Sequence, residues 1–227
     1  AGQVKDIGDL VLICPDSTAL TNDYYDAFSG HAGLLTYAVG VSGTVLYADV
    51  MSGSWNRIAA GTDATLYGIY LADYNYMKGW IVGTNGTVRH SIDYGQTWST
   101  VGIGTIQDLM DVEFIGPYSG LIVGTVGSIF HTTDGGLNWN PVNSGTVQTL
   151  HDADYITLEH AWAVGTLGTI INSSDGGASW SIQQSGSVED LFGVAFVDAQ
   201  TGWVVGGSGT LLKTTNAGQN WQKVNSG

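Results

Sequence analysis

The chain has little cysteine, proline or positive charge, and no long hydrophobic run. Its single cysteine, Cys14, excludes an internal disulfide and any Cys-based zinc or redox motif. Its longest apolar runs, such as LVLIC, are far shorter than the about 18 residues that a membrane-spanning helix needs. We therefore expect no direct insertion into a membrane, and either a soluble protein or the mature part of an exported one.

Basic residues are the scarcest charged class. Six Lys and Arg stand against 20 Asp and Glu, a formal net charge of −14, so the phosphates of nucleic acids and anionic lipids are repelled. Nucleic acid is excluded as an expected partner. A hydrophobic fraction of 43%, with 34 glycines and eight tryptophans, is typical of a folded protein.

What the chain does contain is a repeat. Tryptophans recur at intervals of 43, 41, 41 and 41 residues, and a glycine lies fifteen residues before each of them. The tryptophans are at positions 55, 98, 139, 180 and 221. Within each unit, short alternating or apolar runs are separated by glycine-containing turns, which indicates four strands and no helix.

Repeated units of about forty residues with four strands each are typical of β-propeller blades. We predict an all-β fold: one five-bladed β-propeller domain, residues 1–227, with blades of about 41 residues. The predicted blades are a degenerate first blade at about 1–61, followed by 62–104, 105–145, 146–186 and 187–227.

The start of the first blade has two interpretations. Residues 9–14 form its inner strand and a long loop follows, or the weaker sequence YYDAF, residues 24–28, is the inner strand and residues 1–18 add a closing or docking strand. The sequence does not decide between them.

One turn recurs in the last four units, with a Ser or Thr, an Asp or Asn, a Gly and a Trp at fixed spacing. A short acceptor side chain in this turn can bind backbone N–H groups, and glycine can adopt the positive φ that the turn needs. We interpret these residues as structural and non-catalytic, with the tryptophan packed against a neighbouring sheet. They are Ser91, Asp93, Gly95, Trp98; Thr132, Asp134, Gly136, Trp139; Ser173, Asp175, Gly177, Trp180; and Thr214, Asn216, Gly218, Trp221.

These turns resemble the Asp-box, or bacterial neuraminidase repeat. With the recurring GWxVGxxGT pattern, they look most similar to the photosystem II stability and assembly factor type of propeller repeat. The resemblance covers residues 62–227 well and 33–61 in part. It implies a propeller with Asp-boxes at the blade periphery. A sialidase binds its substrate with three arginines, whereas this chain has two. The resemblance to sialidases is therefore limited to the turns.

Four acidic residues break the repeat: Asp111, Glu113, Asp152 and Asp154 share one face of the inner strands of two adjacent units. Such crowding can raise pKa values or attract a hard cation such as calcium. The interpretation that we favour is that the acids face water in the central channel or bond to backbone at a blade junction. The five histidines lack metal-type spacing, so we expect no metal site outside these acids and no cofactor.

Aromatic residues outside the repeat columns gather in two loops. Tyr24 and Tyr25 lie in the first, and Tyr74, Tyr76 and Trp80 in the second. If exposed, they suit contacts with sugars or proteins; the alternative is packing around the irregular first blade.

The sequence favours a non-catalytic binding or structural propeller, such as an adhesin, on an extracellular, cell-envelope or virion surface. Its expected partner is a glycan or a protein, and assembly into larger oligomers is compatible with it. One alternative is a glycan-directed hydrolase that uses the four acids. Another, implied by the resemblance, is an assembly factor for a membrane complex such as a photosystem.

Overall fold

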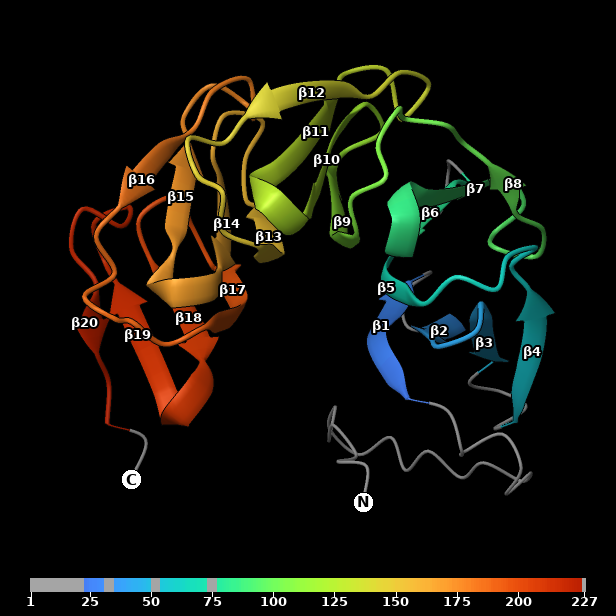
Figure 1. Cartoon of the computed structure of the whole chain (residues 1–227), viewed down its shortest axis with the longest axis horizontal. Helices are drawn as coiled ribbons and strands as arrows, with labels where there is room; N and C mark the ends of the chain where they lie inside the picture. Colours follow the sequence, from blue (N-terminus) through green and yellow to red (C-terminus); the bar gives the residue numbers. More distant parts are fainter. Residues whose placement is uncertain (1–22, 31–34, 50–53, 73–76, 226–227) are drawn as a thin grey trace. The chain divides into compact units, whose positions relative to one another are not determined.

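The computed structural model describes residues 23–30, 35–49, 54–72 and 77–225 of the chain. In these ranges the regular elements are strands and four short 3-10 turns. No helix in the described ranges is long and apolar enough to cross a membrane. The strands form five four-stranded sheets (Figure 1), so the prediction of an all-β, five-bladed β-propeller is confirmed.

Within each sheet the strands follow chain order, because each strand pairs with its sequence neighbours in that sheet. The first two sheets contain β1 (Tyr24–Gly30), β2 (Leu35–Gly40), β3 (Thr44–Asp49) and β4 (Trp55–Ala59), then β5 (Leu66–Leu71), β6 (Gly79–Gly83), β7 (Thr87–Ser91) and β8 (Ser99–Thr100). The third sheet contains β9 (Leu109–Ile115), β10 (Ser119–Gly124), β11 (Ser128–Thr132) and β12 (Asn140–Asn143). The last two contain β13 (Leu150–Tyr155), β14 (Ala161–Gly165), β15 (Ile170–Ser173) and β16 (Ser181–Gln183), then β17 (Leu191–Phe196), β18 (Gly202–Gly206), β19 (Thr210–Thr214) and β20 (Gln222–Lys223).

The chain divides into two compact units. The first comprises residues 1–83 and 88–101 and holds the first two sheets, and the second comprises residues 84–87 and 102–227 and holds the last three. Tyr37, Val39, Leu66 and Ile81 are buried in the core of the first unit, where β2 of one sheet packs against β5 and β6 of the next.

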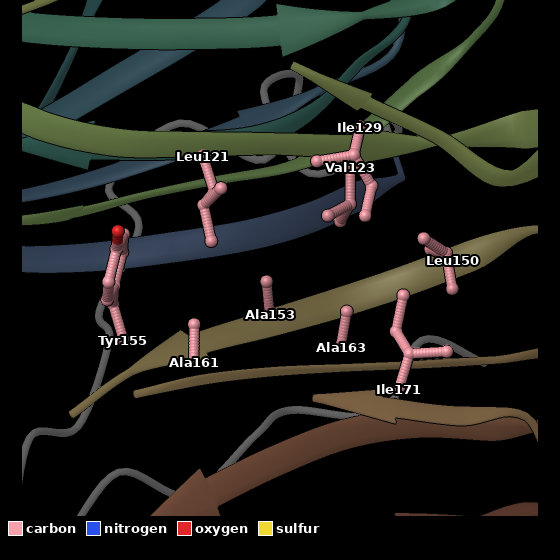
Figure 2. Packing of buried hydrophobic residues seen from close by; sticks show 9 residues of the cluster. All are labelled: Leu121, Val123, Ile129, Leu150, Ala153, Tyr155, Ala161, Ala163 and Ile171. Carbon is pink, nitrogen blue, oxygen red and sulfur yellow. The ribbon is translucent and has the colours of Figure 1, made fainter. Parts of the chain in front are cut away.

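The core of the second unit lies between successive sheets. Figure 2 shows side chains of the third and fourth sheets pointing toward one another, with Leu121 and Val123 opposite the smaller Ala153, Ala161 and Ala163. Large residues facing small ones allow the two sheets to pack closely. The second strands β10 and β14 are buried on both faces, which explains their continuous apolar sequences.

Between the second and third strands, the last four blades make a tight 3-10 turn: η2 (Thr84–Gly86), η3 (Thr125–Gly127), η4 (Thr166–Gly168) and η5 (Gly207–Gly209). Gly127 in η3 has a φ of +65°, and a Cβ on it would lie 2.1 Å from the carbonyl oxygen of Thr146. Only glycine fits this position, so each turn can lie directly against the loop that leads to the next blade.

The structure decides between the two interpretations of the first blade. Strand β1, which begins at Tyr24 and contains the YYDAF sequence, pairs with β2 as the first strand of its sheet. Residues 1–18, including Cys14, lie outside the described residues.

Candidate functional site

The repeated aspartate turn closes through hydrogen bonds made within eight residues. Thr132 Oγ1 donates to Asp134 Oδ1 at 2.8 Å and accepts a bond from the Gly136 N–H at 3.0 Å. The other end of the turn binds the same carboxylate: the Asn138 N–H donates to Oδ1 at 2.9 Å, and Asn138 Nδ2 donates to Oδ2 at 2.7 Å. Both oxygens of Asp134 therefore hold the turn together.

The other three turns repeat this geometry. The equivalent bonds join Ser91, Asp93 and Thr97; Ser173, Asp175 and Ser179; and Thr214, Asn216 and Asn220. In the last turn the amide oxygen Oδ1 of Asn216 accepts the two hydrogen bonds that a carboxylate oxygen accepts in the other turns. Its donors are Thr214 Oγ1 at 2.9 Å and the Asn220 N–H at 3.0 Å. The turn thus needs the acceptor oxygen and tolerates loss of the charge.

Hydrogen bonding also sets the protonation state of these carboxylates. The bonds from Asn138 hold the pKa of Asp134 below its ordinary value, and those from Ser179 do the same for Asp175. A group held ionised in this way is a poor general acid, because an acid must carry a proton near neutral pH.

The tryptophans that end these turns are largely covered. Trp139 packs edge-on against Phe114 in its own sheet, with ring centroids 5.6 Å apart. Trp180 packs against the core between the third and fourth sheets, and Trp98 against the core of the first unit. Trp221 contacts Phe196, and its Nε1 donates to Gln183 Oε1 at 3.2 Å.

Three of the four acids that break the repeat bind backbone of the following blade. Asp111 Oδ2 accepts from the Ala153 N–H at 3.0 Å, and Asp152 Oδ2 accepts from the Val194 N–H at 2.7 Å. Asp154 Oδ2 accepts from the Phe196 N–H at 2.5 Å. The structure thus places these carboxylates at blade junctions, which is one of the arrangements that the sequence left open.

Within this acidic cluster, the pKa of Asp154 is shifted by its surroundings. Burial raises the pKa of Asp154 even though it accepts backbone hydrogen bonds. Glu113 lies on β9, two residues after Asp111. Among the described residues, no group of three or more His, Cys, Asp or Glu is arranged to hold a metal ion.

A further acid, Asp26, makes the same contact at a blade junction and was not predicted from the sequence. Asp26 Oδ2 on β1 accepts from the Ile69 N–H at 2.9 Å, the same contact that Asp111 makes two blades later. The signal was present, because aligning YYDAF with the other inner strands puts Asp26 in the column of Asp111 and Asp152.

The expected aromatic binding residues do not form one exposed group among the described residues. The prediction of Trp80 as a binding residue is wrong. Its side chain is 1% exposed and packs against the His90 ring in its own sheet, because β6 is buried on both faces. Tyr25 is 51% exposed and contacts Tyr67, and Tyr24 is partly buried on β1. The predicted Tyr74 and Tyr76 lie outside the described residues.

A pocket of about 290 Å³ lies on the fifth blade. Its walls come from the loop at 185–189 and from β19 and β20, and they include Leu212, Trp221, Glu189 and Lys223. Glu189 Oε2 accepts a hydrogen bond from Ser208 Oγ at 3.0 Å.

Comparison with known proteins identifies the repeat. A family model described as photosynthesis system II assembly factor YCF48 matches residues 47–145 and 137–226. A search among curated protein sequences finds no match. The similarity to the photosystem II assembly factor type of repeat is confirmed by the family match.

Two similar solved structures, with TM-scores of 0.50 and 0.73, support the fold. YCF48 from Cyanidioschyzon merolae is 16% identical, with a TM-score of 0.50 over 89% of this chain and 85% of that one. A structure of YCF48 bound to D1 peptide is 20% identical, with a TM-score of 0.48 over 89% of this chain and 81% of that one. An ancestral GH74 enzyme is 16% identical, with a TM-score of 0.73, but the match covers 90% of this chain and only 31% of the enzyme.

These findings correct the expected function. The surface-displayed, glycan-binding adhesin is wrong, because the matching family is described as an assembly factor for a photosystem. The glycan partner, the viral assignment and the extracellular, envelope or virion location are wrong for the same reason. The assembly-factor alternative is the one that the family match supports, and its description names no enzymatic activity.

Proposed function

We propose that this chain, which belongs to the photosynthesis system II assembly factor YCF48 family, is a non-catalytic assembly factor that binds a protein component of photosystem II during its assembly. The observation that carries this proposal is the family match, which spans residues 47–226 in two overlapping segments and includes all four aspartate turns.

The positions of the carboxylates support a role without catalysis. A hydrolase that attacks glycosidic bonds needs two carboxyl groups facing a groove. Here Asp134 and Asp175 bind within their own turns, while Asp111, Asp152 and Asp154 accept backbone N–H groups from the next blade. These bonds favour a rigid support for exposed loops.

A protein partner agrees with the composition of the chain. A net charge of −14 opposes binding to nucleic acid and to anionic lipid, whereas a folded protein or a peptide can complement it. A D1 peptide is named with one solved YCF48, so it is the first ligand to test here.

The decisive experiment is capture and rescue in a photosynthetic host that lacks its own YCF48. The tagged chain is expected to co-purify photosystem II subunits and to restore accumulation of the assembled photosystem. The matched control is Gly127→Ala in the tagged chain, which targets the fold and leaves the exposed side chains in place. A folded wild-type chain that captures no photosystem II subunit and restores no assembly would refute the proposal.

Titration of the purified chain with a D1 peptide gives a second test. We expect saturable binding that a scrambled peptide of equal composition does not show. Release of reducing sugar from a glucan would instead support the hydrolase alternative.

A further inference from the structure

Five exposed aliphatic side chains lie at one end of the strands in the second unit. We call them the aliphatic row: Ile106 (82% exposed), Val126 (58%), Val147 (74%), Leu167 (65%) and Val188 (80%). Single exposed aliphatic residues are ordinary, but here they recur at two positions of the repeat.

Backbone contacts place the row members at the same end of their sheets. The Thr125 N–H donates to the Asp108 carbonyl at 2.9 Å, which brings η3, and with it Val126, beside the loop that carries Ile106. A Cβ on Gly127 would meet the Thr146 carbonyl, and a Cβ on Gly168 would meet that of Ser187. Each η turn therefore touches the loop of the next row member.

Two members of the row are held in a backbone conformation that opposes their side chains. Val126 has a φ of 59° and Leu167 a φ of 54°, in the left-handed region where branched residues are rare. The equivalent residues of the other blades are Ser42, Asn85 and Ser208, which are polar.

Neither backbone preference nor core packing explains an exposed valine and leucine at these two positions. Apolar side chains that cost stability locally point to a role in binding.

One of the turns that carry the row, η4, is fixed by a side-chain bond from the following blade, and η2, the equivalent turn with the polar Asn85, is fixed in the same way. The Leu167 N–H donates to Asp190 Oδ1 at 2.9 Å, and the Asn85 N–H donates to Asp108 Oδ1 at 2.9 Å. A surface fixed in this way loses little conformational entropy when a partner binds.

The charge beside the row is negative. Asp108, Glu189 and Asp190 border it, and Lys223 is a basic residue among those that line the pocket with Val188. Residues 102–227 as a whole contain eleven acidic and two basic residues. A partner that approaches this end therefore meets an apolar line beside carboxylates.

The row ends at the pocket on the fifth blade. Val188 and Glu189 form part of its wall, and the buried Leu212 and the partly buried Trp221 add apolar surface. A pocket of this size can receive one large side chain of a bound segment.

We infer that the aliphatic row and this pocket form the docking surface for an extended protein segment in which aliphatic residues alternate with lysine or arginine. The inference rests on the proposed function and adds the surface and the partner's chemistry. In this complex the aliphatic side chains of the bound segment cover the row, and its lysine or arginine side chains lie near Asp108, Glu189 and Asp190. An anionic membrane surface does not fit, because these carboxylates repel it.

The test measures binding of three fluorescent peptides of equal length to the full chain. One alternates leucine with lysine, the second replaces each lysine with glutamate, and the third replaces each leucine with serine. We expect the leucine–lysine peptide to bind at least about tenfold more tightly than either of the others.

Matched variants then locate the binding. The row variant carries Val126→Asn, Val147→Asn and Leu167→Asn, and we expect it to lose about tenfold or more in affinity. The control variant carries Leu137→Asn, Leu158→Asn and Val197→Asn, three exposed aliphatic residues at the opposite end of the same unit, and should bind like the wild type.

Stability separates a binding role from a structural one. Asparagine accepts the left-handed conformation more readily than valine or leucine, so Val126→Asn and Leu167→Asn should raise the melting temperature while binding weakens. A row variant that melts lower than wild type, or binds the peptide equally well, would overturn the inference. Binding of wild type to phosphatidylglycerol vesicles that the row variant loses would also overturn it, in favour of a membrane surface.

The proposed function can fail independently. If the row variant still captures photosystem II subunits as well as the wild type does, the docking surface is wrong and the assembly role stands. If the peptide binds to the row but no photosystem II subunit is captured, the surface stands and the assembly role is wrong.

Discussion

At the scale of single residues, the aspartate turns show which chemical property the repeat requires. Asp134 and Asn216 occupy the same position and accept the same two hydrogen bonds, although only the first is charged. The common property is an acceptor oxygen at the correct distance from two N–H or O–H donors.

We expect Asp134→Asn to change stability little and Asp134→Ala to lower the free energy of unfolding by about 1 to 2 kcal/mol, because alanine leaves the donors of Thr132 and Asn138 without their acceptor. Urea denaturation of both variants measures the difference. Asn216→Ala is the matched control and should behave like Asp134→Ala. Equal losses for Asp134→Asn and Asp134→Ala would show that the charge matters.

Three histidines make the stability depend on pH. Burial lowers the pKa of His90, His131 and His151 below the ordinary 6.5, and nearby Asp175 and Asp190 only partly oppose it at the latter two. In the described part of the chain, their Nε2 atoms are buried without a hydrogen-bond partner. The folded protein therefore favours neutral imidazoles.

Since the folded pKa values lie below those of the unfolded chain, the unfolded state binds more protons under mildly acidic conditions. We expect full stability above pH about 6.5 and a decrease as the pH falls below it, measured by urea denaturation at a series of pH values. His131→Asn, which introduces the residue found at the equivalent Asn172, should reduce this pH dependence. An unchanged slope in that variant would contradict the assignment to His131.

At the scale of elements, the η turns and the loops between blades are fitted to one another. Gly127 and Gly145 both have positive φ, but only Gly127 approaches backbone, the Thr146 carbonyl. Comparing the two therefore separates backbone strain from steric conflict.

Gly145→Ala should cost about 1 kcal/mol, because alanine is strained at positive φ. Gly127→Ala should cost clearly more, since its Cβ must also displace the loop at Thr146. Thermal and urea denaturation of the two variants test this. Equal effects would mean that the loop moves aside without cost.

At the scale of the whole molecule, stability depends on packing between successive sheets. Trp162 is fully buried and stacks on Phe196 of the next blade, with ring centroids 3.6 Å apart. Its equivalent in the last blade, Trp203, is partly exposed and contacts Lys213 Nζ at 5.1 Å.

Trp162→Ala should lower the free energy of unfolding by about 3 to 5 kcal/mol, because it leaves a large cavity between two sheets. Trp203→Ala, the control at the same repeat position, should cost much less. Denaturation followed by circular dichroism measures both. If both variants lost a similar free energy of unfolding, Trp203 would have to be covered in solution as Trp162 is.

Much of the fold could be predicted because its signals are local. The 41-residue period, the strand runs and the turn around Asp134 depend on residues within a few positions of one another, and their bonds close inside one hairpin. Short-range geometry of this kind is determined by the sequence itself. The family resemblance was visible in the same turns.

The tertiary structure alone decided what the remaining residues contact. Trp80 is buried because sheets cover both faces of β6, and Asp152 binds the N–H of Val194, 42 residues away. Contacts across blades depend on which surfaces meet after folding, and a local pattern in the sequence does not identify the residue on the other blade. For the same reason, the exposed aliphatic row became visible only when η3 and η4 were seen against the loops of the next blades.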